Sequence, residues 1–542
     1  MRILITLLFS TVILLCSSCY KGEEVDLIVH NARIHCMDDA NTVAEAMAIK
    51  DGKIVEVGPE RQILNKYRSD EILDAGQRDI YPGFTDAHGH LMEYAKQKLG
   101  IDLTGATSWE SVIRQLMKHP RNEAFVLARG WDNTLWENAQ LPDNAELNRL
   151  FPNIPAALYR VDGHAVLVND FLLQKAGISS KTKVQGGKVE LKNSKCTGIL
   201  LDNAMGLIEN YLGDFKASSY KQKLVGIQEE LLSLGITGVH EAGITDTQFD
   251  ILRQMNQAGT LKIQVYAMLA ANDANYALAK KMGIWDKGNL VVRSFKLYLD
   301  GALGSRGALL KNNYSDAPTE NGLLLTSREN YKKWIQRSLD LNYQLNVHAI
   351  GDSANALALH SMADVFLENP DHRWRIEHAQ VVDPKDLPLF MEYAVIPSVQ
   401  PTHATTDCRW ALDRLGAARM KGAYAYRSLY EQLGMIVLGT DFPVESIDPF
   451  ATIRSAVLRT NAESKPKKGF NISEALSLDL VLRGMTIWPQ VASFQESKKG
   501  KLTEGMEATF FIAAKPISLQ TLNTRNYAWK TFVKGSCVMN AE

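Results

Sequence analysis

The chain has 542 residues, of which 46% are hydrophobic and 22% are charged. This composition is typical of a globular protein, and the length is sufficient for a large core together with a second domain. With 60 basic and 61 acidic residues, the net charge is −1, which gives no support to a nucleic-acid-binding protein.

The first residues have the features of an export signal rather than of a folded element. Arg2 precedes an apolar run over residues 3–15, which is too short to span a bilayer as a helix. The small residues before Cys19 resemble a bacterial lipoprotein signal, so we expect residues 1–18 to be removed and Cys19 to be lipidated. Cleavage by ordinary signal peptidase is the alternative, because Cys16 stands where Leu is usual. The expected location is the bacterial cell envelope, facing the periplasm or the cell surface, with the lipid as the membrane contact.

Both ends of the chain carry short strand patterns. Residues 46–58 predict a hairpin with Asp51-Gly52 at its turn. Near the carboxyl end, residues 509–514 predict a strand and residues 529–539 another hairpin. We expect residues 20–81 and 490–542 to form one small β-sandwich domain.

Residues 82–489 alternate between apolar strands and helical segments, which predicts an α/β domain with a parallel sheet. Eight strands are expected, and eight fit a closed (β/α)8 barrel of the TIM type. Residues 91–216 are too long for an ordinary connection after the first strand, so we expect a folded insertion over the active face. The eight expected strands are residues 80–86, 237–241, 263–269, 294–299, 344–349, 375–379, 395–399 and 436–440.

Titratable residues stand at the ends of five of these strands, and the carboxyl ends of barrel strands carry the active groups. His88-x-His90 places two imidazoles on one face of the first strand, although such a pair alone is equally consistent with two surface histidines. Lys296 lies inside an apolar run, where a lysine usually has a carboxylate partner, and Asp300 is available. Together the strand ends predict a metal site. Its expected ligands are His88, His90, Lys296, His348, His378 and Asp441.

Other polar residues are candidates for contact with a substrate. Arg160, Asp162 and His164 lie in the expected insertion, and His403 follows the seventh strand. His240 ends the second strand and is expected to support the metal ligands.

This series of residues resembles the amidohydrolase superfamily, which comprises metal-dependent hydrolases on a (β/α)8 barrel with a flanking β-sandwich. The strings at residues 296–306, 348–352, 398–403 and 439–445 resemble the branch that includes N-substituted formamide deformylases. One departure is Ala508-Thr509, where relatives usually have Ala-Asp.

The resemblance implies one or two divalent metal ions. His88, His90 and Asp441 would bind the first, His348 and His378 the second, and a carbamylated Lys296 would bridge them. A one-metal site with unmodified Lys296 is the alternative. Nitrogen and oxygen ligands favour zinc, with iron or manganese as alternatives.

The resemblance also implies the chemistry. The ion would activate a water for attack on a carbonyl, and Asp441 and His378 are the expected catalytic residues. The leading hypothesis is hydrolysis of a C–N bond in an amide, formamide or cyclic amide of a small molecule. An ester or lactone hydrolase on the same site is one alternative. A non-catalytic metal-binding or ligand-binding lipoprotein is the other, and the complete ligand set argues against it.

Overall fold

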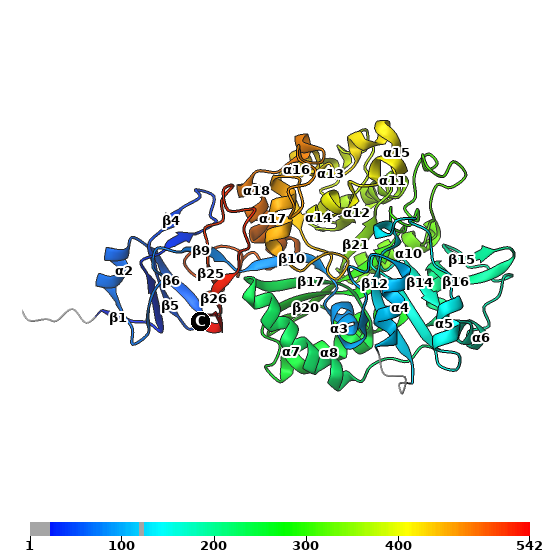
Figure 1. The fold of residues 1–542 in the computed structure, drawn as a ribbon. Coiled ribbons are helices and arrows are strands. Elements are labelled where there is room, and N and C mark those ends of the chain that lie inside the picture. Colours follow the sequence, from blue (N-terminus) through cyan, green and yellow to red (C-terminus); the bar gives the residue numbers. More distant parts are fainter. Residues whose placement is uncertain (1–21, 119–123, 542) are drawn as a thin grey trace, which may run out of the picture.

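The computed structural model of the protein describes residues 22–118 and 124–541, and its centre is a parallel sheet of eight strands in chain order. The last strand returns to the first: the Asp441 N–H donates to the His88 carbonyl at 2.7 Å, and the His90 N–H donates to the Phe442 carbonyl at 2.8 Å. The sheet is therefore a nearly closed barrel of the TIM type, as predicted (Figure 1). Its strands are β10 (Phe84–Gly89), β17 (Ile236–Ile244), β18 (Gln264–Ala270), β20 (Leu290–Tyr298), β21 (Gln344–Ala349), β22 (Arg375–His378), β23 (Ile396–Val399) and β24 (Val437–Leu438), and β19 (Trp285–Lys287) pairs with β20 from outside the barrel.

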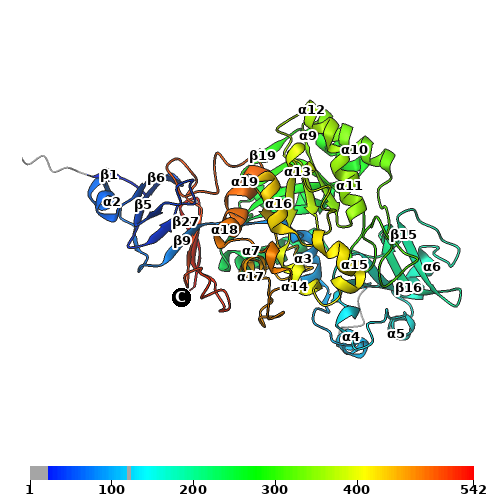
Figure 2. The same cartoon turned by 90° about the horizontal axis from the view of Figure 1, so that it is seen from above.

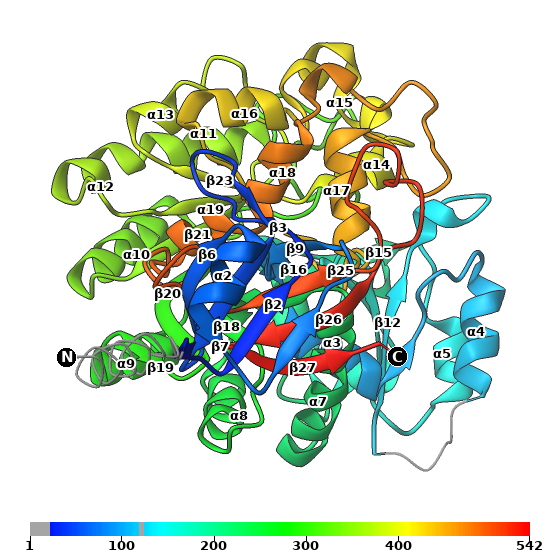
Figure 3. The ribbon, with the colours of Figure 1, turned by 90° about the vertical axis from the view of Figure 1, so that its left-hand side faces the viewer.

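Strands from both chain ends form two further sheets on one side of the barrel (Figures 1 and 3), in the orders β6-β5-β2-β8 and β27-β26-β25-β9-β3-β4. The two sheets share a buried core that includes Leu27, Met47, Ile80 and Phe510. The strands are β2 (Leu27–His30), β3 (Arg33–His35), β4 (Val43–Ala44), β5 (Ala46–Lys50), β6 (Lys53–Gly58), β8 (Ile72–Asp74), β9 (Asp79–Pro82), β25 (Phe510–Ala513), β26 (Ala528–Val533) and β27 (Ser536–Asn540); β1 (Glu23–Glu24) pairs with β7 (Tyr67–Arg68), and helix α2 is Glu60–Lys66.

The first barrel strand differs from its prediction. The expected strand at residues 80–86 is divided between β9, which belongs to a terminal sheet, and β10, which begins at Phe84. Gly83 stands at the change of sheet, where a Cβ would lie 2.1 Å from the Thr237 hydroxyl oxygen. The dipeptide Pro82-Gly83 is a turn signal at this point, and the prediction of one continuous strand overlooked it.

A six-stranded sheet, β11-β12-β13-β14-β16-β15, lies between β10 and β17 in the sequence. Alternate residues of its strands enter two cores: Leu158 and Leu167 face one side, and Val166 and Leu200 face the other. In Figures 1 and 2 this sheet and the terminal sheets lie on opposite sides of the barrel. Its elements are α4 (Trp109–Met117), η1 (Asn133–Leu135), α5 (Ala145–Leu150), α6 (Asp170–Lys175), η2 (Asn203–Ile208), β11 (Ile101–Asp102), β12 (Val126–Trp131), β13 (Ala156–Arg160), β14 (Ala165–Val168), β15 (Gly187–Lys192) and β16 (Lys195–Asp202).

Helices surround the barrel when it is viewed from the side of the terminal sheets (Figure 3). Local sequence explains their limits: α8 begins after Thr245, whose side chain accepts the Gln248 N–H in a capping box. The helices are α3 (Leu91–Leu99), α7 (Ala217–Ser233), α8 (Asp246–Gln257), α9 (Asp273–Met282), α10 (Arg328–Asp340), α11 (Asp352–His360), α12 (Met362–Glu368), α13 (Leu389–Glu392), α14 (Pro401–Asp407), α15 (Ala411–Arg419), η3 (Met420–Gly422), α16 (Tyr426–Leu433), α17 (Pro449–Val457), η4 (Ile472–Glu474), α18 (Leu478–Met485) and α19 (Ile487–Ala492).

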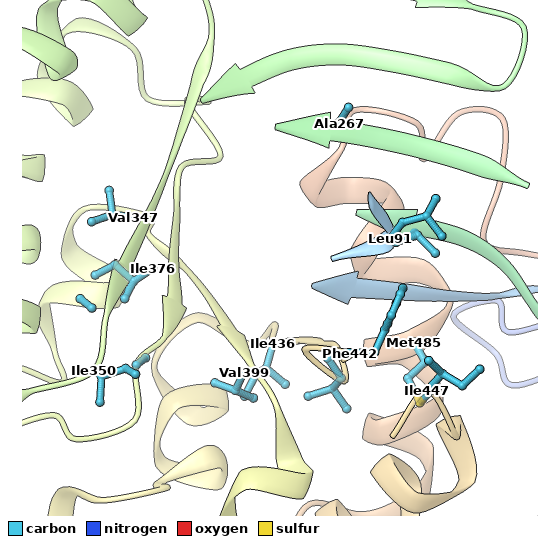
Figure 4. Close-up of a cluster of buried hydrophobic side chains, with 14 of the residues drawn as sticks. Leu91, Ala267, Val347, Ile350, Ile376, Val399, Ile436, Phe442, Ile447 and Met485 are labelled. Carbon is cyan, nitrogen blue, oxygen red and sulfur yellow. The ribbon is translucent and has the colours of Figure 1, made fainter. Parts of the chain in front are cut away.

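The barrel strands and these helices share one large hydrophobic core. Figure 4 shows part of it, with Val347, Ile376 and Val399 on successive strands. In the described part of the chain, no helix combines the length and apolar character needed to cross a membrane. The expected boundary at residue 490 falls within α19, and the division into domains stays a prediction.

Candidate active site

The His88-x-His90 pair and Asp441 lie together at the mouth of the barrel. The Nε2 atoms of His88 and His90 lie 3.5 Å and 3.1 Å from Oδ1 of Asp441. The three side chains offer one ligand atom each within 4.8 Å of one another, which is a spacing that can hold a metal ion. Burial alone would raise the pKa of Asp441, but hydrogen bonds from His403 and His90 hold it well below its usual range. Asp441 is therefore ionised, as a metal ligand must be.

His348 and His378 extend this cluster from the ends of β21 and β22. Their ring centroids are 4.5 Å apart, and the His378 ring lies 4.8 Å from the ring of His88. Burial, together with positive charge nearby, lowers the pKa of both imidazoles well below the ordinary value. Both are therefore neutral, which leaves a nitrogen lone pair for a metal.

Two buried nitrogens at this mouth have no hydrogen-bond partner in the described chain, Nε2 of His348 and Nδ1 of His378. A buried polar atom without a partner is costly, at about 1–3 kcal/mol. His378 and Asp441 also have positive φ angles, 73° and 63°, which L-residues adopt rarely and which cluster at functional sites. Unpaired imidazole nitrogens that converge from different strands beside an ionised carboxylate fit a divalent ion.

Lys296 is buried beside these ligands, with Nζ 3.3 Å from Nε2 of His88. Burial lowers the pKa of its ammonium to about 8. The expected pairing with Asp300 is wrong. The Asp300 carboxylate lies beyond the end of β20, where it accepts the N–H groups of Leu309, Ile350 and Gly351 at 2.8–2.9 Å.

A buried network that the sequence analysis missed supports His88 from beneath. The Glu377 carboxylate contacts Nδ1 of His88, and it accepts hydrogen bonds from Ser398 Oγ at 2.6 Å and from Arg375 Nε at 2.7 Å. A second nitrogen of Arg375 lies 2.8 Å from Nδ1 of His240, so His240 supports the ligands only indirectly. A carboxylate on Nδ1 fixes the ring and leaves Nε2 directed at a metal. The available signal was a pair of opposite charges two residues apart in a buried strand, which places both on one face.

A cavity of about 1380 Å³ opens above the cluster. Residues from the barrel strand ends and from the six-stranded sheet contribute to its wall. Among the expected site residues, the lining includes His90, Arg160, Asp162, His164, His348, His378, His403 and Asp441.

Arg160 and Asp162 lie on this wall but are already paired. The Arg160 guanidinium contacts the Asp162 carboxylate, donates to Asp132 at 2.6 Å, and donates from Nε to the Asn133 amide oxygen at 3.1 Å. His164 lies deeper, with Nδ1 2.8 Å from Asp202 and its ring centroid 5.3 Å from that of His348. Of these three expected substrate contacts, His164 is the one beside the cluster.

His403, expected to contact substrate, lies within the cluster itself. Its Nε2 is 3.2 Å from Oδ2 of Asp441, and its Nδ1 is 3.3 Å from Oε1 of Glu445. His378, His403 and Asp441 form a second group with metal-ligand spacing. Burial lowers the pKa of His403, but hydrogen bonds to the two carboxylates outweigh burial and raise it well above the ordinary value. Glu445 ends the string at residues 439–445, and no role was expected for it from the sequence.

Comparisons with known proteins agree with this fold and this cluster. A model of the amidohydrolase family matches residues 71–539. The putative amidohydrolase YtcJ of Bacillus subtilis is 29% identical over 532 residues, covering 94% of this chain and 99% of that protein. The N-substituted formamide deformylase of Arthrobacter pascens is 23% identical over 538 residues, covering 94% and 97%.

Solved structures show the same arrangement. An uncharacterised metal-dependent hydrolase from Pyrococcus horikoshii superposes with a TM-score of 0.74 at 27% identity, covering 90% of this chain and 97% of that one. A zinc-bound adenosine deaminase from Xanthomonas campestris, with a TM-score of 0.53 at 13% identity and coverage of 96% and 94%, shares the fold. The chain belongs to the amidohydrolase family and is a metal-dependent hydrolase, and its relatives include an N-substituted formamide deformylase.

Proposed function

We propose that the protein hydrolyses a C–N bond in an amide, formamide or cyclic amide of a small molecule. The observation that carries the proposal is the convergence of two unpaired, buried histidine nitrogens and the Asp441 carboxylate at the bottom of one cavity. His88, His90 and Asp441 would hold one divalent ion, and His348 and His378 a second. The ion supplies Lewis acidity and a water of lowered pKa, and a ligand set of nitrogen and oxygen atoms favours zinc.

Side chains of the protein would transfer the proton from the attacking water to the leaving nitrogen. The Asp441 carboxylate is ionised, so it would accept a proton from the attacking water and pass it to the leaving nitrogen. His403 bridges Asp441 and Glu445, so it orients the Asp441 carboxylate toward the cavity. Glu377 holds the His88 ring in place.

Lys296 is proposed to become a carbamate that bridges two ions. A pKa of about 8 leaves a substantial fraction of the amine uncharged near neutral pH, and the uncharged amine is the form that reacts with CO2. In Lys296→Ala we expect turnover to be lost and the content of tightly bound metal to fall from two ions to one. Unchanged loading with two ions would remove the bridging role.

A substrate screen tests the main proposal. Zinc-loaded protein is incubated with N-substituted formamides, N-acyl amines and cyclic amides, and with matched esters and lactones, and the release of amine or acid is measured. The deformylase relative makes formamides the first class to test. Hydrolysis of at least one C–N compound is expected. Turnover of esters alone would favour the ester or lactone hydrolase, and a native protein that contains no metal would contradict both.

We also propose that the protein is an exported lipoprotein. Residues 1–18 and Cys19 lie outside the described residues, so this proposal rests on the signal-like sequence alone. Metabolic labelling with a lipid precursor is expected in the wild type and not in Cys19→Ala. Equal labelling of the two proteins would contradict lipidation at this residue.

A further inference from the structure

Arg129, in β12, is a buried cation with few partners. It is 9% exposed and lines the same cavity as His90 and Asp441. Its guanidinium makes one described polar contact, from Nη1 to Oε2 of Glu93, at 3.4 Å. Its Nε is buried and has no hydrogen-bond partner in the described chain. A guanidinium carries five N–H donors, and burying its charge without a hydrogen-bonded partner is costly.

Two other buried arginines have a polar partner for each of their side-chain nitrogens. Arg160, on the same wall, contacts two carboxylates and an amide oxygen. Arg375, beneath the cluster, contacts a carboxylate, a backbone carbonyl, a hydroxyl and a histidine. Both side chains are fixed by the protein alone. Arg129 differs from them because its one partner is distant and because it faces the cavity.

The backbone opposite Arg129 leaves room beside the guanidinium. Gly163 has φ +73°, and a Cβ at that position would lie 3.1 Å from Nη2 of Arg129. A larger residue would press on the donor, and L-residues rarely adopt this φ. Gly163 also lines the cavity, so this space is continuous with the space above the metal ligands.

We propose that Arg129 binds a carboxylate of the substrate, so that the hydrolysed molecule is an amide or formamide that also carries an acidic group. The proposal rests on the proposed function and specifies its substrate class. A planar guanidinium with free donors matches a carboxylate in a two-bond geometry. Glu93 is the group that a substrate displaces: its side chain is 37% exposed and its contact is long, so it can turn toward solvent.

Binding measurements test the proposal with probes that the zinc-loaded protein does not hydrolyse during the titration. The probes are pairs of small N-formyl and N-acyl amino acids and their primary amides, titrated calorimetrically into zinc-loaded protein. We expect at least one carboxylate to bind about 30-fold more tightly than its amide, as a charge-assisted pair allows. In Arg129→Gln this preference should disappear. A wild type without any preference for carboxylates would overturn the proposal, and so would a preference that persists in the variant.

Two further variants control the experiment. Arg409 lines the same cavity with an exposed side chain, 4.0 Å from Asp132, and Arg409→Gln should retain the preference. Glu93→Gln removes the competing carboxylate, so carboxylate binding should strengthen by about 3-fold to 10-fold. A loss of preference in Arg409→Gln equal to that in Arg129→Gln, or weaker binding in Glu93→Gln, would contradict the assignment. If no compound is hydrolysed but carboxylates still bind through Arg129, the proposed function fails and the binding site stands.

Discussion

Two regions of the site contain similar charged residues that are paired very differently. The floor consists of the metal-ligand cluster with the network of Glu377 and Arg375 beneath it, and the wall is the part of the cavity that carries Arg129. Beneath the cluster, Glu377 and Arg375 are fully buried and bond to each other and to their neighbours. On the wall, Arg129 keeps a single long contact and faces open space. A saturated network orients a ligand and does not respond to what enters the cavity, whereas an unsaturated group gains from a partner. The floor therefore suits the chemistry and the wall suits recognition.

The largest expected effect comes from breaking the floor at Asp441. Asp441→Asn removes the charge that three histidines contact and the acceptor for the proton. We expect kcat/KM to fall by at least about 10³-fold and metal content to fall with it. Metal analysis of the purified variant accompanies the kinetics. Full metal loading with full activity would remove Asp441 from the site.

The next effect tests the support under His88. Glu377→Gln leaves Arg375 without a buried anion, so we expect a loss of about 3–5 kcal/mol in the free energy of unfolding. It also releases the His88 ring, and metal affinity should fall by about 10-fold to 100-fold. Denaturant unfolding and competition with a chelator measure the two effects. As a matched control, Ser398→Ala removes one hydrogen bond to the same carboxylate and should cost about 1–2 kcal/mol.

A pH-dependent effect of a few kcal/mol is expected at Glu241. This side chain lies within β17 and accepts the N–H groups of Leu91 and Met92, and burial raises its pKa to about 8 from an ordinary 4.5. The folded state therefore holds a proton that the unfolded state releases, so the stability that this group contributes falls as pH rises from about 4.5 to 8. Glu241→Gln cannot ionise, and its stability relative to the wild type should rise across that window. If the difference in unfolding free energy between Glu241→Gln and the wild type is the same at pH 5 and pH 8, the raised pKa of Glu241 is contradicted.

The smallest effect belongs to the wall. Gly163→Ala places a methyl group at positive φ, 3.1 Å from the Arg129 guanidinium, and should cost about 1–2 kcal/mol of stability. Metal content should stay at the wild-type value, because residue 163 contacts no expected ligand. A loss of metal in this variant would show that the wall and the floor are coupled.

Most of the barrel and the cluster could be predicted because each strand is an apolar run followed by a polar residue. This pattern does not predict the partner of Lys296. Its position inside a strand indicated a need for a partner, but whether Asp300 turns toward it depends on the loop that follows the strand. Glu377 was missed because it stands inside a strand between Ile376 and His378, and its one signal, the opposite charge of Arg375 two residues earlier, does not show whether that face is buried. Arg129 was missed because its importance lies in contacts that it does not make, and a sequence does not show these.

The junction at Gly83 has a consequence for the order of folding. β9 pairs with β25, so Ile80 lies opposite Ile512, and the two residues are far apart in the sequence. During synthesis from the amino end, β9 keeps one unpaired edge until residues 510–513 have been made. Contacts between distant residues form slowly, and an open strand edge can pair with another chain. Because β9 leads directly through Gly83 into β10, the first barrel strand is synthesised early. It then lies next to the open edge of β9, which only β25, near the carboxyl end, can cover.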